Sequence, residues 1–157
     1  MPRTGNDKAG HRALRVGRAS IPHRIYLVTT TTVQRKALFL NFDAARSAAR
    51  CFENRQILND SSLLAWVLMP DHVHWLLQLG ERDVLDRLVS RLKSASARNA
   101  NAILAWRGGV WVRSYHDHAL RVEEDLPTIA RYIVMNPVRA GLVRRIGDYP
   151  FWNAVWL

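Results

Sequence analysis

The sequence contains almost no cysteine: Cys51 is the single one among 157 residues. An internal disulfide is therefore impossible, and zinc sites built from several cysteine ligands are excluded. Chains with so little cysteine are typical of reducing compartments, and we expect this protein to work in the cytoplasm.

Long apolar stretches are also missing. None approaches the roughly 20 consecutive apolar residues that a membrane-spanning helix needs, and the first residues lack the continuous apolar segment of a secretory signal. We therefore expect no membrane partner. An ordinary folded domain is expected instead, because 48% of the residues are hydrophobic and can form a core.

Acidic residues are scarce relative to basic ones. The chain carries 13 Asp and Glu residues against 23 Lys and Arg residues, which gives a formal net charge of +10 and a pI of about 11.0. A chain this basic favours a polyanionic partner, and nucleic acid is a better candidate than a membrane surface. Charge alone does not identify the partner, since many basic proteins bind no polyanion.

Residues 1–20 differ in character from residues 21–157. They contain a single acid, Asp7, several glycines that interrupt any helix, and the basic residues Arg3, Lys8, Arg12, Arg15 and Arg18. This composition predicts a basic flexible arm that lies along a phosphate backbone. A disordered terminus explains it equally well, and both hold if the arm orders on binding. We interpret residues 21–157 as one domain.

Apolar periodicity predicts seven helices and strands in that domain. Strands are expected at residues 24–33, 63–69, 72–79 and 110–120, and helices at residues 44–57, 83–103 and 123–136. The first six follow the order βαββαβ, which is the ferredoxin-like or RRM-like arrangement of the α+β class: an antiparallel sheet with helices on one face. The third helix is then free to cover the other face.

Two histidines, His72 and His74, begin the third predicted strand and are separated by one residue. Side chains two positions apart on a strand point to the same face of a sheet. Two imidazoles on one face can hold a divalent metal ion, although an isolated pair of this kind is more often structural. His116 and His118, with Asp117 between them, form a rival pair.

A metal ion on His72 and His74 needs a further ligand, and the last predicted helix offers one. Tyr132 and Asn136 are four residues apart and share a side of that helix. Asn136 offers an amide oxygen to a hard cation such as Mg2+ or Mn2+. Tyr132 then lies beside the metal ion, where its oxygen can attack a phosphodiester.

The chain has three other tyrosines, Tyr26, Tyr115 and Tyr149. Each is a rival nucleophile. Tyr26 and Tyr115 lie in predicted strands with apolar neighbours, where a core role is usual, and Tyr149 precedes Pro150 in the tail. Their surroundings favour structural roles.

Two blocks of sequence carry a resemblance to a known family. The first is residues 69–74, Met-Pro-Asp-His-Val-His, and the second is residues 130–143, Ala-Arg-Tyr-Ile-Val-Met-Asn-Pro-Val-Arg-Ala-Gly-Leu-Val. Together with the block His-Asp-His-Ala-Leu-Arg at residues 116–121, they resemble the REP-associated tyrosine transposases. These are relatives of the single-tyrosine HUH transposases of insertion sequences, the IS200-like superfamily.

The resemblance implies both a fold and a chemistry. Members of that family have a ferredoxin-like fold and cut single-stranded DNA at repetitive extragenic palindromes, where they read a foldback hairpin and a short tetranucleotide. The resemblance implies that His72 and His74 hold a divalent metal ion and that Tyr132 is the nucleophile. Residues 21–157 would then be a catalytic domain that nicks and rejoins DNA through a covalent phosphotyrosine. Asn136 stands where insertion-sequence relatives often have a glutamine ligand.

Partner and location follow from the same resemblance. It implies a bacterial, nucleoid-associated protein that acts in the cytoplasm on single-stranded or hairpin DNA. A monomer is expected of the REP-associated members, whereas the insertion-sequence relatives are dimers. Both states stay open for this chain.

Basic side chains along the chain are candidates for DNA binding. They are Arg12, Arg15, Arg18, Arg87, Arg91, Arg139, Arg144 and Arg145. His116 and His118 are accessory candidates, and Trp75 and Trp111 are candidates for stacking on unpaired bases. A solvated surface is the alternative explanation for each arginine.

Two other functions also fit the sequence. A catalytically silent RRM-like module would bind a hairpin with strong salt dependence but would not cut it. A hydrolytic zinc enzyme would hold zinc on His72, His74 and another residue, and would cleave DNA without becoming attached to it.

Overall fold

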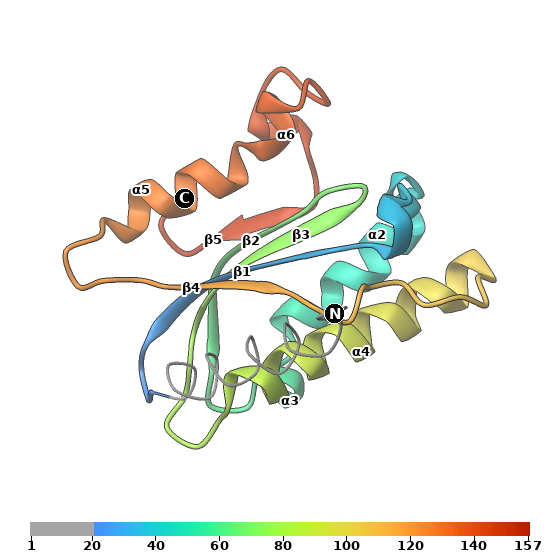
Figure 1. Cartoon of the computed structure of the whole chain (residues 1–157). Coiled ribbons are helices and arrows are strands. Elements are labelled where there is room, and N and C mark those ends of the chain that lie inside the picture. The colour runs from blue at the N-terminus through green and yellow to red at the C-terminus, as the bar shows by residue number, and fades with distance from the viewer. Residues whose placement is uncertain (1–20) are drawn as a thin grey trace, which may run out of the picture.

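The computed structural model describes residues 21–157. They form one sheet with helices on both faces (Figure 1). The expected basic arm at residues 1–20, which includes Arg12, Arg15 and Arg18, lies outside the described residues. Within residues 21–157, every helix is too short or too polar to cross a membrane.

The sheet has the strand order β4-β1-β3-β2-β5, and every neighbouring pair is antiparallel. Its strands are β1 (Ile25–Thr31), β2 (Ser62–Leu68), β3 (His72–Gln78), β4 (His116–Ala119) and β5 (Trp152–Ala154). The first four strands form the ferredoxin-like arrangement, so the predicted α+β fold is confirmed. The C-terminal tail adds β5, which pairs with the edge of β2 and was not predicted.

The helices divide between the two faces of the sheet. They are α2 (Phe42–Ala49), α3 (Arg55–Leu58), α4 (Leu85–Leu104), α5 (Leu126–Val134) and α6 (Asn136–Arg139). Short 3-10 turns accompany them: η1 (Val33–Arg35), η2 (Leu38–Leu40), η3 (Arg50–Glu53) and η4 (Ile146–Asp148). α2, α3 and α4 lie on one face, and α5 lies across the other, as expected for the third predicted helix (Figure 1).

The helix expected at residues 44–57 is divided into α2, η3 and α3. Asn41 begins α2, because its side chain accepts a hydrogen bond from the Ala44 amide at 3.0 Å. Asn54 has an extended backbone (φ −80°, ψ 117°) and accepts from the Gln56 amide at 2.9 Å. Asn54 therefore interrupts the helix and starts the next one, since asparagine competes with the helix for backbone donors.

The strand expected at residues 110–120 is much shorter than predicted. Only β4 pairs along β1, while Trp111 forms an isolated bridge with Thr32. Lys93 on α4 donates to the backbone carbonyls of Val112 and Ser114, each at 2.9 Å. Lys93 thus holds this segment against α4, and regular pairing with β1 begins only at β4.

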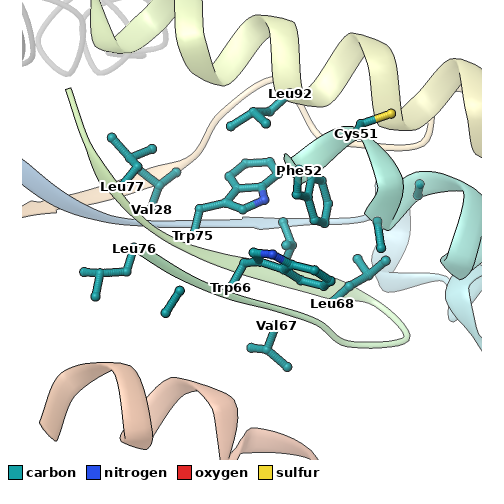
Figure 2. Packing of buried hydrophobic residues seen from close by; sticks show 14 of the residues in the cluster. Val28, Cys51, Phe52, Trp66, Val67, Leu68, Trp75, Leu76, Leu77 and Leu92 are labelled. Carbon is teal, nitrogen blue, oxygen red and sulfur yellow. The ribbon is translucent and has the colours of Figure 1, made fainter. Parts of the chain in front are cut away.

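Buried residues lie on both faces of the sheet, and the larger aromatic part of the core lies between the sheet and the helices α2, α3 and α4 (Figure 2). Phe52 packs against two tryptophans, with ring centroids 5.1 Å from Trp66 and 5.5 Å from Trp75. Trp75 is fully buried and Trp111 is 9% exposed, so the prediction that they stack on bases is wrong. Val73 and Trp75 are buried on this face. Because side chains alternate along a strand, His72 and His74 therefore point to the α5 face.

Candidate metal and tyrosine site

His72 and His74 lie side by side on β3, on the sheet face opposite Val73 and Trp75. The register with β1 places Thr31 beside His72 and Thr29 beside His74. The two imidazole ring centroids are 5.0 Å apart, and both side chains are partly buried. The structure thus brings the predicted pair together.

Each imidazole is held through its Nδ1 atom. His72 Nδ1 is 2.8 Å from Asp71 Oδ1, and His74 Nδ1 is 2.7 Å from Thr29 Oγ1. These contacts leave the Nε2 atoms for a metal ion, and metal-binding histidines almost always use their other nitrogen in this way. The sequence marks neither partner, because Asp71 follows Pro70, a pairing typical of turns, and Thr29 belongs to a run of threonines.

The surroundings keep His74 neutral. Burial lowers the pKa of its imidazole to about 4, and the neighbouring His72 and then Arg139 add to this shift. At neutral pH the ring therefore offers a lone pair, as metal binding requires. The effect of Arg139 also indicates that α6 lies near the histidine pair, in agreement with its position by the β2–β3 hairpin in Figure 1.

Tyr132 lies on α5, two residues before the helix ends, and is 65% exposed. The guanidinium of Arg139 lies over its ring, 3.9 Å from the ring centroid, within the range of a cation–π contact. Since the charge of Arg139 also acts on His74, this arginine connects the tyrosine to the histidine pair.

The other tyrosines are engaged in the fold. Tyr26 is fully buried, and Tyr149 is buried with its hydroxyl donating to a backbone carbonyl of β2. Burial raises the pKa of Tyr149 to about 12, which makes it a poorer nucleophile at neutral pH. Tyr115 donates its hydroxyl to Asp86 on α4. Tyr132 is therefore the exposed one of the four tyrosines.

Asn136 begins α6 and does not belong to α5. Pro137 has no N–H to donate to the carbonyl of Ile133, so the α-helical hydrogen bonds are interrupted after Val134. Tyr132 and Asn136 thus lie on consecutive helices, and the expectation of one continuous helix is wrong. Among the described residues the Asn136 side chain has no hydrogen-bond partner, and its role as a third ligand stays a prediction.

The rival histidine pair does not form a comparable site. His116 and His118 are exposed on β4, and Asp117 between them points to the opposite face. His118 Nε2 lies 3.3 Å from Glu124 Oε1. In the part of the chain that the structure describes, no three His, Cys, Asp or Glu side chains gather to hold a metal ion. The zinc-enzyme alternative therefore lacks a third ligand of the usual kind.

The exposed arginines predicted to bind DNA fall into two groups. Arg139, Arg144 and Arg145 lie on or just after α6, on the side of the histidine pair. Arg87 is exposed on α4, on the other side of the sheet. His116 keeps its place as an accessory candidate, because its register with β1 puts it on the histidine face, one strand further out than β1.

Arg91 is engaged in hydrogen bonds within the protein. Its guanidinium donates to Asp83 Oδ1 at 3.1 Å and to the Ile57 carbonyl at 2.7 Å. Asp83 also accepts from the Ser61 hydroxyl at 3.0 Å. This network occupies Arg91 in place of the DNA contact that the sequence suggested.

A ferredoxin-like sheet with a histidine pair on an inner strand, and an exposed tyrosine on the helix across that face, is the architecture of the single-tyrosine transposases. The chain belongs to the IS200-like transposase family: the family described as "Transposase IS200 like" matches residues 22–136. The match includes His72, His74, Tyr132 and Asn136, and the resemblance noted in the sequence is confirmed.

Two relatives and two solved structures illustrate the match. The chain is 32% identical over 98 residues to a Haemophilus influenzae protein classed as a REP-associated tyrosine transposase, covering 56% of each chain. It is 32% identical over 87 residues to the REP-associated tyrosine transposase of Escherichia coli K12, covering 55% of this chain and 50% of the relative. The chain thus spans about half the length of the curated relatives it matches.

The fold comparison agrees with the sequence comparison. A REP-associated tyrosine transposase, solved with a REP hairpin bound, superposes with a TM-score of 0.65 at 24% identity, covering 86% of this chain and 79% of that one. A Deinococcus radiodurans protein described as a transposase superposes with a TM-score of 0.53 at 27% identity, covering 72% of this chain and 91% of that one. Both likenesses support the fold described above.

Proposed function

We propose that this protein is a metal-dependent enzyme that nicks single-stranded DNA and rejoins it through a covalent link to Tyr132. One observation carries the proposal: two histidines oriented through Nδ1 share a sheet face, and Arg139, which contacts the ring of the exposed Tyr132, also acts electrostatically on His74. Membership of the IS200-like transposase family supports the same chemistry.

The available donors fit a divalent cation. In this proposal His72 and His74 would hold the ion through their Nε2 atoms, and Asn136 would add an amide oxygen that suits Mg2+ or Mn2+. An ion held there would supply a Lewis acid for the scissile phosphate. The low pKa of His74 supports the assignment, because a neutral imidazole binds metal without first losing a proton.

Tyr132 is the nucleophile in the proposed reaction. Its oxygen forms a bond to phosphorus, and the bond between phosphorus and the sugar oxygen of the adjoining nucleotide breaks. The tyrosine proton is released, and the departing sugar oxygen takes up a proton to become a free hydroxyl. Because the phosphotyrosine conserves the phosphodiester, a strand hydroxyl that attacks it rejoins the DNA without ATP.

Arg139 orients this nucleophile. A guanidinium on the ring face restricts the ring through a cation–π contact. The same side chain is exposed, so it also presents positive charge to an entering phosphate. It therefore joins the proposed nucleophile and the proposed substrate.

The proposed substrate is single-stranded DNA beside a foldback hairpin of the repetitive extragenic palindrome type. The net charge of +10 supports a nucleic-acid partner. Two relatives are classed as REP-associated, and a protein of similar fold is described with a REP hairpin bound. We place the activity in residues 21–157 of a monomer that acts on nucleoid DNA in the bacterial cytoplasm.

The test is a trapping experiment with a hairpin oligonucleotide and Mn2+. A covalent protein–DNA adduct should appear on a denaturing gel, and Tyr132→Phe should abolish the adduct while hairpin binding persists. Chelation of the metal ion should also abolish it. Tyr115→Phe is the matched control and should still form the adduct. An adduct formed by Tyr132→Phe would refute the proposed nucleophile.

The silent RRM-like module is the less favoured function. Such modules stack bases on exposed aromatic side chains of their central strands. Here the aromatic residues of β1 and β3, Tyr26 and Trp75, are fully buried. On the α5 face, the neighbouring ends of these strands carry Thr29, Thr31, His72 and His74 and no aromatic ring other than the two imidazoles, which supports a catalytic site over a stacking platform. Hairpin binding without cleavage at any divalent metal would restore this alternative.

A further inference from the structure

The turn after β1 has an unusual backbone. Gln34 and Arg35 both have positive φ angles, 56° and 53°, although neither is a glycine. Consecutive left-handed residues with ordinary side chains are disfavoured and persist only where the surroundings hold them. Hydrogen bonds hold this turn, from the Arg35 amide to the Thr32 carbonyl at 3.0 Å and from the Val33 amide to the Val110 carbonyl at 2.9 Å.

The turn places Arg35 against the carboxylate that holds His72. Arg35 Nε is 3.1 Å from Asp71 Oδ2, while Asp71 Oδ1 is 2.8 Å from His72 Nδ1. Thr32 fixes the same segment: its amide donates to the Asp71 carbonyl at 2.9 Å, and its hydroxyl lies 2.7 Å from the Lys36 carbonyl and 3.2 Å from the Asp71 carbonyl. Both carboxylate oxygens of Asp71 are therefore occupied, one by each neighbour.

An ordinary surface ion pair does not account for this arrangement. The Arg35 side chain is 60% exposed, and exposed ion pairs contribute little to stability. The ion pair therefore contributes too little stability to explain a strained turn. Strained backbone in proteins is concentrated at functional sites, which points to a role at the adjoining site. The adjoining site here is His72.

We propose that Arg35 is a positioning residue for the metal centre and acts on His72 through Asp71. Arg35 fixes one carboxylate oxygen, so the other stays aimed at the Nδ1–H of His72, and the lone pair of His72 stays on Nε2. The inference rests on the proposed function, because it takes His72 to be a metal ligand. His74 needs no such device, since Thr29 holds its Nδ1.

The direction in which Mn2+ affinity changes distinguishes this proposal from a purely electrostatic effect of Arg35. Removing the positive charge of Arg35 should strengthen cation binding if Arg35 acts only through its electric field. If Arg35 acts by positioning, its removal should weaken binding instead. The two explanations therefore predict opposite directions for one substitution.

The test is calorimetric titration of Mn2+ into the full chain without DNA. Asp71→Asn should weaken Mn2+ binding by roughly 10- to 100-fold, the usual effect of losing the hydrogen-bond partner of a metal ligand. Arg35→Gln should weaken it by a smaller factor, and Arg35→Lys should recover part of the loss. Arg46→Gln, an exposed arginine on α2, removes the same charge on the other side of the sheet and should change little.

A double variant completes the test. Since Arg35 acts through Asp71, Arg35→Gln should have no further effect in the Asp71→Asn background. Unchanged or tighter Mn2+ binding by Arg35→Gln, or an equal loss in both backgrounds, would overturn the proposal. The titration needs no DNA cleavage. Absence of the covalent adduct in the unmodified protein would therefore refute the proposed function without deciding this inference.

Discussion

Arg139 contacts the proposed nucleophile, and its charge also acts on the histidine pair. Its guanidinium lies 3.9 Å from the centroid of the Tyr132 ring. After burial and His72, its charge is the next cause of the low pKa of His74. A cation placed beside a metal site is unfavourable until an anion joins them, and a DNA phosphate is such an anion. Arg139 should therefore matter more for the reaction than for folding.

Arg139→Ala should slow adduct formation at saturating DNA about 10-fold, because a cation–π contact of about 1 kcal/mol, together with loss of the phosphate contact, corresponds to roughly that factor in rate. Mn2+ binding should not weaken, since the substitution removes a positive charge near the site. Single-turnover gels that follow the covalent adduct measure the rate.

Arg131→Ala is the control, because Arg131 is exposed one residue before Tyr132 on the same helix. Its adduct rate should stay within about twofold of the unmodified protein, as expected for a surface substitution. An unchanged rate in Arg139→Ala would remove Arg139 from the mechanism.

The sequence predicted the proposed metal ligands and the proposed nucleophile, but not the residues that hold the two imidazoles. His72 and His74 could be found because strand alternation is a local property. Thr29 could not, since it meets His74 across a separation of 45 residues. Arg35 reaches Asp71 only through two left-handed residues, and no glycine marks that turn in the sequence.

At the scale of elements, a buried carboxylate fastens the start of α4 to the sheet. Asp83 has a side chain only 3% exposed, and it accepts hydrogen bonds from Arg91, from Ser61 just before β2 and from the Val84 amide. Burial on its own raises the pKa of this carboxyl. The hydrogen bonds, with that of Arg91 the largest, outweigh burial and hold the pKa below the ordinary value of 3.8.

The sign of the pH dependence follows from this shift. Below pH 3.8 the unfolded chain binds a proton at Asp83 more readily than the folded chain does. The stability that ionised Asp83 contributes is therefore present above that pH and is lost as the pH falls further. Asp83→Asn should lower the free energy of unfolding at neutral pH by about 3 kcal/mol, because it leaves Arg91 unpaired. It should also reduce the fall in the free energy of unfolding at acidic pH, measured by urea unfolding at a series of pH values.

Asp148→Asn provides the comparison. Asp148 pairs with Arg145 at 3.7 Å, but both side chains are largely exposed. The expected loss in the free energy of unfolding is below about 1 kcal/mol, and its dependence on acidic pH should stay as in the unmodified protein. Equal losses for the two variants would show that the Asp83 network does not fasten α4.

Element order was predictable, while element ends depended on contacts distant in sequence. The apolar periods that give βαββαβ lie within each segment. The residues before β4 are held by Lys93 on α4, which donates hydrogen bonds to their backbone carbonyls. β5 is a three-residue strand, too short for a period, and exists because Val67 and Ala65 on β2 offer it an edge.

For the whole molecule, the sheet separates two surfaces. α5 and α6 lie on one of them and α4 lies on the other (Figure 1). Strand alternation puts the histidine pair on the α5 side, and Arg87 is exposed on α4. DNA that brings a phosphate to Tyr132 must lie on the first surface. If the proposed function is right, a basic residue should contribute to hairpin binding according to its side of the sheet, even though the whole chain is strongly basic.

This separation predicts different salt dependences for two sets of variants. Each phosphate contact adds about 0.7 to 0.9 to the slope of log K against log salt. The double variant Arg144→Gln, Arg145→Gln should bind a REP-type hairpin more weakly and lower that slope by about 1 to 2, because both side chains are exposed beside α6. Arg87→Gln should leave affinity and slope unchanged. Fluorescence anisotropy at several salt concentrations measures both, and an equal loss in Arg87→Gln would mean that the hairpin lies along α4 instead.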